Sequence, residues 1–149
     1  MKDLQSDKIA FCNYTVKWAT TIELLLENHL SELISLSKHS RDSEQFKKVW
    51  HETDFCKDCG IAHAKELLGY SSEAITGGGC GDPENWQELF TIANELHDFL
   101  IPLTKPEHYT SEVFQKIADF NSSLRSIRKK LEQAGSQSVA DDNSMEHLT

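Results

Sequence analysis

The feature that most constrains the fold is a long run of apolar residues at helical spacing near the end of the chain. The steps between them alternate between four and three residues, at Val113, Ile117, Phe120, Leu124, Ile127 and Leu131. This alternation places them along one side of an α-helix, as in the seam of a helix packed nearly parallel to its neighbours. The sequence therefore predicts a helix that belongs to a bundle and ends at Gly135.

Two other stretches show the same period. Residues 7 to 38 contain neither proline nor glycine, and apolar residues recur in them at intervals of three and four. Residues 82 to 101 are similar, and they begin with Asp-Pro, a common helix start. Shorter helices are expected around residues 46 to 50 and over residues 56 to 68, with Gly69 as the stop signal.

No segment alternates apolar and polar residues in the way that a half-buried strand does. We therefore predict an all-α fold, an up-and-down helical bundle with about four helices in cross-section and additional short helices. Residues 1–135 are expected to form this single domain. The polar and acidic residues 136–149 are expected to be a disordered tail.

The charge balance narrows the range of partners. The chain of 149 residues has a formal net charge of -9 and no stripe of Lys and Arg, which disfavours nucleic acid. The cations at 125, 128, 129 and 130 are instead ascribed to the negative end of the last helix dipole. No apolar run approaches the length of a membrane span, and the first residues lack an apolar signal core. A cytoplasmic protein without membrane contact is expected.

The segment from His51 to His63 is the chemically informative one. Cys56 and Cys59 form a C-x-x-C pair followed by Gly60, a spacing that lets two thiolates hold one metal ion from a tight turn. His63 follows Cys59 by four residues, and His51 precedes Cys56 by five. Soft and borderline ligands of this kind predict a tetrahedral zinc site made of Cys56, Cys59, His63 and His51.

Other interpretations of these residues remain open at this point. The C-x-x-C pair is also compatible with a thiol–disulfide switch, or with cysteines that are only structural. Cys80, in the glycine-rich stretch 77–81, and two histidines on apolar stripes, His29 and His97, are secondary ligand candidates. Cys12 lies on the apolar face of the first predicted helix and is expected to be a buried small side chain.

These observations favour a small soluble regulatory or sensory bundle with a zinc site or a redox-responsive thiol site. The alternative is a non-catalytic interaction module, such as an adaptor, an effector or a chaperone-like subunit, in which the cysteines are structural. Both hypotheses imply a protein partner, and a homo-oligomer is compatible with either. No catalytic set can be recognised, which disfavours an enzyme; in a metal hydrolase, Glu52 or Asp54 would be the nearest bases.

Overall fold

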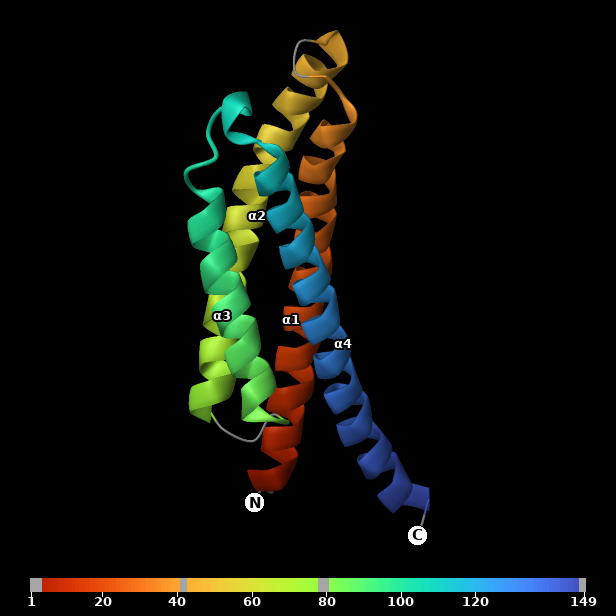
Figure 1. The fold of residues 1–149 in the computed structure, drawn as a ribbon. Helices are drawn as coiled ribbons and strands as arrows, with labels where there is room; N and C mark the ends of the chain where they lie inside the picture. Colours follow the sequence, from red (N-terminus) through yellow and green to blue (C-terminus); the bar gives the residue numbers. More distant parts are fainter. Residues whose placement is uncertain (1–3, 41–42, 78–80, 148–149) are drawn as a thin grey trace.

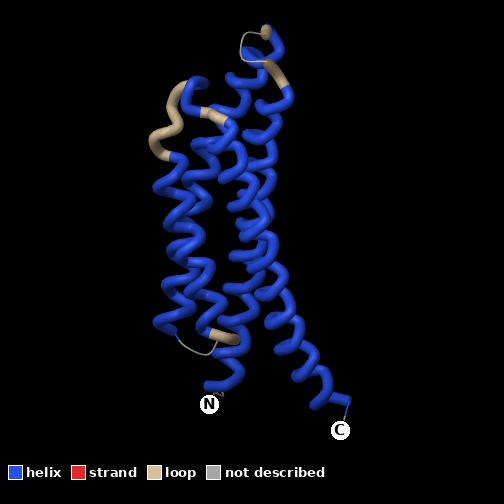
Figure 2. The backbone as a smooth tube through the Cα atoms, viewed as in Figure 1, coloured by secondary structure: helices blue, strands red, loops and turns tan. Residues whose placement is uncertain are grey.

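The computed structural model describes residues 4–40, 43–77 and 81–147, and side chains within residues 12–40, 43–52, 57–77 and 81–133. It contains four long helices, α1 (Leu4–Ser35), α2 (Glu44–Gly77), α3 (Pro83–Leu100) and α4 (Ser111–His147). Two 3₁₀ turns, η1 (Leu36–Lys38) and η2 (Pro106–His108), lie in the connections. No strand occurs among the described residues (Figure 2), so the predicted all-α class is confirmed.

The helices run alternately up and down and form the predicted bundle (Figure 1). Helix α1 packs closely against both α2 and α4, and α3 packs mainly against α2. The contact between α3 and α4 is the thinnest of the four seams. Beyond it, the C-terminal part of α4 diverges from the other helices (Figure 1).

The core consists of the residues that the helical period selects. The seam predicted for the last helix faces inward, with Ile117, Phe120, Leu124, Ile127 and Leu131 buried and Val113 packed at its edge. The other helices meet this seam with a similar set, which includes Ile22, Leu26, Leu30, Leu67, Trp86, Leu89, Leu96 and Leu100. Burial of these side chains is the main stabilising contribution to the bundle.

Helix α2 differs from the prediction in one respect that matters for function. The two short helices and the polar cysteine turn are a single helix of 34 residues. Gly60 does not open a turn but lies buried, where an added Cβ would be 3.5 Å from Leu100 and 3.6 Å from Leu26. Gly69 does not end the helix, because tertiary packing outweighs the cost of about 1 kcal/mol for a helical glycine.

The helix starts follow local capping chemistry. Asp82 accepts a hydrogen bond from the Glu84 amide at 2.9 Å ahead of α3, as predicted from Asp-Pro. Ser43 accepts from the Phe46 amide at the start of α2, and Thr110 accepts from Val113 at the start of α4. These side chains satisfy amides that have no partner within the helix.

The end of α4 also differs from the sequence prediction. The helix passes Gly135 and continues to His147, over most of the stretch predicted to be a disordered tail. Propagation of an existing helix costs far less than its nucleation, and a single glycine is not an absolute stop. The cations at 125–130 therefore lie in the middle of α4, and the helix-dipole explanation for them is wrong.

Within the described part of the chain, none of the helices combines the length and the apolar character that a membrane span requires.

Candidate functional site

Two histidines from different helices meet at the seam between α1 and α2. The rings of His29 on α1 and His63 on α2 are stacked, with their centroids 5.3 Å apart and their planes 18° from parallel. Both side chains are half-buried. Each belonged to a different set of predicted ligands, so the structure brings together residues that the sequence analysis had kept apart.

The helical register explains how each ring reaches the seam. His29 follows buried Leu26 and precedes buried Leu30, so it lies at the border of the apolar stripe of α1. His63 occupies the same kind of position on α2, beside Gly60 and Ala64, both of which are buried. Small residues there let the two helices approach closely enough for their border side chains to meet.

Electrostatics favour the uncharged form of His29. Burial lowers its pKa below the ordinary value, and the neighbouring His63 lowers it further, while Glu32 opposes the shift. A neutral imidazole carries a free lone pair, which is the form that binds a metal or accepts a proton.

A carboxylate lies beside the second ring. Nδ1 of His63 is 3.3 Å from Oε1 of Glu66, one turn further along α2. The angle is not that of a hydrogen bond, and Nδ1 is buried without a hydrogen-bond partner. A small rotation would align the pair, hold the Nδ1 proton and leave Nε2 as the free donor atom.

A thiol completes the chemistry on this side of α2. Cys59 is free and half-buried, and it precedes His63 by four residues on a continuous helix, so both share one face. Cys56 lies in α2, but its side chain is outside the described residues, and so is Cys80. Because Cys59 is free, it is not joined to Cys56 as a disulfide in this structure.

The predicted set of four zinc ligands is not assembled by the described side chains. His51 is exposed on α2, and five helical residues separate it from Cys56 by about 140° around the axis. In a turn, the side chains at these two positions could converge on one metal ion. In a continuous helix, the two positions lie on different sides of the axis. Within the described part of the chain, no three His, Cys, Asp or Glu side chains are placed to hold one metal ion.

The remaining candidates have other surroundings. His97 is half-buried on α3, with Nδ1 3.1 Å from the Asp98 carboxylate, and the ring that stacks on His29 is that of His63. Cys12 is buried as expected, but it is engaged in a disulfide. Disulfides are typical of oxidising compartments, so the cytoplasmic location stays a prediction.

A second polar cluster, which the sequence analysis missed, lies on the opposite side of α1. Glu27 is buried and accepts hydrogen bonds from Arg128 of α4, at 2.6 Å from Nε and 3.3 Å from Nη2. Arg125 approaches the same carboxylate at 3.4 Å. The sequence did contain a signal for this cluster. Two glutamates, Glu23 and Glu27, lie four residues apart on an apolar helix, and arginines lie on a distant helix.

Glu23, one turn before Glu27, is buried with an exposed fraction of 0%, and neither of its carboxyl oxygens has a hydrogen-bond partner. Burial, and after it the charge of Glu27, raise the pKa of Glu23 to about 9, although Arg128 opposes the shift. The carboxyl is therefore protonated at neutral pH, which avoids a buried unpaired charge.

Comparisons of the chain with protein-family models, with curated proteins and with solved structures gave no match.

Proposed function

We propose that this protein is a small regulatory helical bundle whose input is a transition-metal ion, zinc in the first place, bound at the α1–α2 seam by His29 and His63. The observation that supports this proposal is the separation of the two imidazole centroids, 5.3 Å. Two imidazoles on one tetrahedral zinc, with bonds of about 2.0–2.1 Å, have their centroids about 5 Å apart. The existing separation therefore suits a shared ion after rotation of the rings.

The third ligand in this proposal is Cys59, whose side chain would have to turn towards the two rings, because no three described side chains are placed to hold one ion in this structure. It shares a face of α2 with His63, and its thiol is free and partly accessible. A set of two imidazoles and one thiolate selects zinc over magnesium or calcium, which require oxygen ligands. Water would occupy the fourth position. The proposal therefore replaces the predicted turn site by a site that joins two helices.

Metal at this place would act on the arrangement of α1 and α2. A metal ion that bridges two helices stabilises the conformation in which its ligands converge, and its binding energy adds to the stability of that packing. A regulatory protein needs such a link between input and conformation.

The test is zinc-dependent stability of the full chain after treatment with chelator. Zinc at 100 times its Kd is expected to raise the free energy of unfolding by about 2.7 kcal/mol, and magnesium is expected to have no effect. His63→Phe should keep the ring stacking and lose the zinc response. His51→Gln, which changes an exposed histidine on the same helix, is the matched control and should retain it.

Two results would refute the metal site. One is an unchanged melting temperature with zinc. The other is an equal zinc response in wild type and in His63→Phe, which would place the ion elsewhere.

Protein binding is a second candidate function, favoured by one face of α1. Tyr14, Trp18 and Leu25 lie on this face with exposed fractions of 58%, 42% and 42%, and the first two rings are in edge contact at 6.0 Å. Clustered exposed aromatic and aliphatic side chains are typical of interaction surfaces. His29 lies on the same face, one turn after Leu25, so the proposed input and this surface share a helix.

Sedimentation of the wild-type chain and of Trp18→Ser tests the simplest occupant of this face, a second copy of the chain. A concentration-dependent dimer that Trp18→Ser dissolves is the expected result. A wild-type monomer at all concentrations excludes the second copy.

A further inference from the structure

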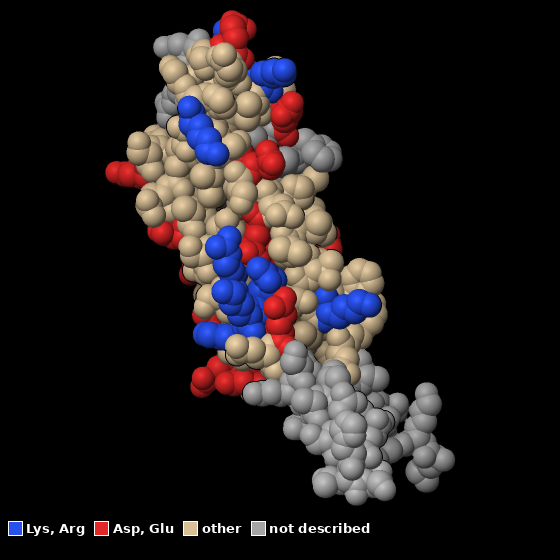
Figure 3. Space-filling model, turned by 90° about the vertical axis from the view of Figure 1, so that its right-hand side faces the viewer, with Lys and Arg blue, Asp and Glu red and all other residues tan. Residues whose placement is uncertain are grey.

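The middle of α4 carries a cluster of positive side chains on this acidic protein. Figure 3 shows Lys and Arg side chains gathered on the face that α4 presents to solvent. A hollow of about 370 Å³ lies there, lined by Ser122, Arg125, Ser126, Lys129, Lys130 and Gln133. The helix dipole favours cations only in the last turn of a helix, so it does not explain why these cations gather in the middle of α4.

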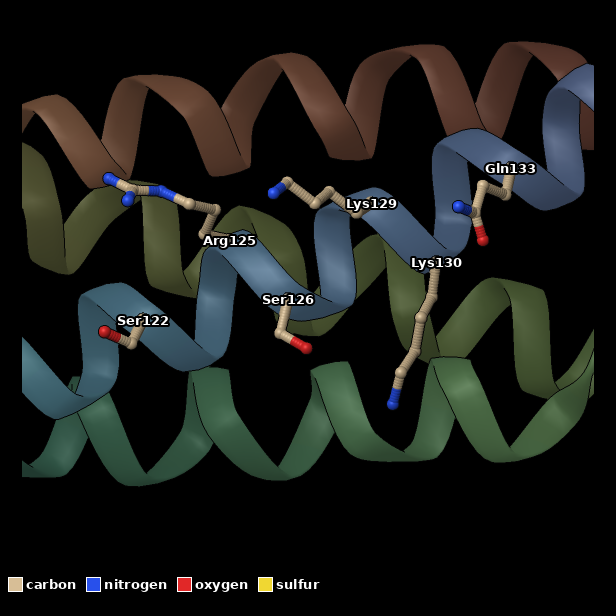
Figure 4. A pocket seen from close by; sticks show the side chains of 6 residues that line it. All are labelled: Ser122, Arg125, Ser126, Lys129, Lys130 and Gln133. Atoms are coloured by element: carbon tan, nitrogen blue, oxygen red, sulfur yellow. The ribbon is translucent and has the colours of Figure 1, made fainter.

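The lining side chains approach the hollow from both sides of α4. Arg125 extends towards α1, Lys130 extends towards α3, and Lys129 runs along α4 (Figure 4). The residues from 122 to 133 span about 16 Å along the helix axis. The three cations therefore surround an elongated depression that a single small anion could not fill.

The cations differ in how firmly the protein holds them. Arg128, just beside the hollow, is turned inward to the buried Glu27 and is not available. Lys130 pairs with Glu88 at 3.2 Å, and both side chains are about half exposed. Arg125 is exposed and reaches Glu27 only at 3.4 Å. The exposed pair of Lys130 with Glu88 contributes little to stability, so a ligand with more charge can displace it.

Lys129 has no partner of this kind. Among the described side chains it makes neither an ion pair nor a hydrogen bond, although Glu132 and Glu88 neutralise other cations nearby. Four cations at 125, 128, 129 and 130 face Glu27, Glu88 and Glu132, while Glu23 is uncharged. The depression therefore keeps a local positive excess in a chain of net charge -9.

We propose that this depression binds an anion with two or more phosphate groups. Lys and Arg supply charge-assisted hydrogen bonds to phosphate oxygens, and the hydroxyls of Ser122 and Ser126 are further donors. The volume lies at the lower end of the range for small-molecule sites. The length of the depression favours a chain of phosphates over a single one.

Titration calorimetry of the full chain with inorganic tripolyphosphate tests this site. Binding to the wild type should weaken as the salt concentration rises, because the cations are exposed. Lys129→Gln, which removes no ion pair or hydrogen bond among the described side chains, should weaken it at least tenfold. Lys48→Gln, with the same change at an exposed position on α2, should bind as the wild type does.

Two comparisons decide the ligand class. Citrate should bind much more weakly than tripolyphosphate; equal binding would show that charge alone is recognised and would overturn the proposal. Retention on vesicles that contain a phosphorylated inositol lipid, without binding of free tripolyphosphate, would overturn it in favour of a membrane surface. Equal affinity of Lys129→Gln and wild type for tripolyphosphate would show that this depression is not the binding site.

Discussion

The two sides of α1 pack against neighbouring helices through different polar groups. Towards α4, the helix buries an ion pair, Glu27 with Arg128, and beside it the neutral acid Glu23. Towards α2, it places a neutral imidazole, His29, against His63. The first arrangement is costly to disturb because its groups are out of water, whereas the second is half-buried and open to an added ligand.

The two sides should also respond to pH in opposite directions. Glu23 has a raised pKa, so the folded state holds a proton that the unfolded state releases, and stability falls as the pH rises from about 4.5 to about 9. His29 has a lowered pKa, so the unfolded state binds the proton more readily, and stability falls as the pH drops below about 6.5.

The largest expected effect comes from breaking the α1–α4 side at Glu27. Glu27→Gln removes the charge that partners Arg128 and should lower the free energy of unfolding by about 3 kcal/mol, the usual cost of breaking a buried pair. Glu88→Gln makes the same change in the exposed pair with Lys130 and should cost less than about 0.5 kcal/mol. Urea unfolding measures both, and equal losses would show that burial of the pair has no special weight.

An effect with a defined pH dependence is expected at Glu23. Glu23→Gln cannot ionise, so relative to wild type it should gain up to about 1.4 kcal/mol per pH unit between pH 5 and pH 8. Glu95→Gln, the same change at an exposed position of α3, should leave the pH profile of stability unchanged. Parallel profiles of Glu23→Gln and wild type would contradict a protonated Glu23 in the folded state.

The smallest effect is expected on the α1–α2 side. His29→Phe keeps an aromatic ring against His63 and should change stability at pH 7 by less than about 1 kcal/mol. Below pH 6 it should be less acid-sensitive than wild type, because it cannot be protonated. Thermal unfolding at pH 5 and pH 7 measures the difference; a large loss at pH 7 would mean that the imidazole itself holds the seam together.

The sequence predicted the parts of the structure that depend on period and on local chemistry. The seam from Val113 to Leu131 and the Asp82-Pro83 helix start are examples. It failed where tertiary contact overrides a local signal, as at Gly60, which was interpreted as a turn and is a close contact between helices. The continuous α2 then altered the candidate site.

The pairings across seams were beyond the sequence for a related reason. His29 meets His63, and Glu27 meets Arg128, because of the relative height and rotation of separate helices. One sequence gives the face on which each side chain lies, but not the neighbour it meets. Polar residues on an apolar stripe were visible in each case; their partners were not.

Gly60 carries a consequence for tracing the ancestry of this chain. Its missing side chain lies where α1, α2 and α3 converge, within van der Waals reach of Leu26 and Leu100 for an added methyl group. A branched residue there would wedge apart all three helices at once. Divergent homologues that keep the same fold should therefore retain glycine, alanine or serine at this position even after most surface residues have changed. Because Glu27 and Arg128 form an ion pair, homologues should either keep both residues or lose both.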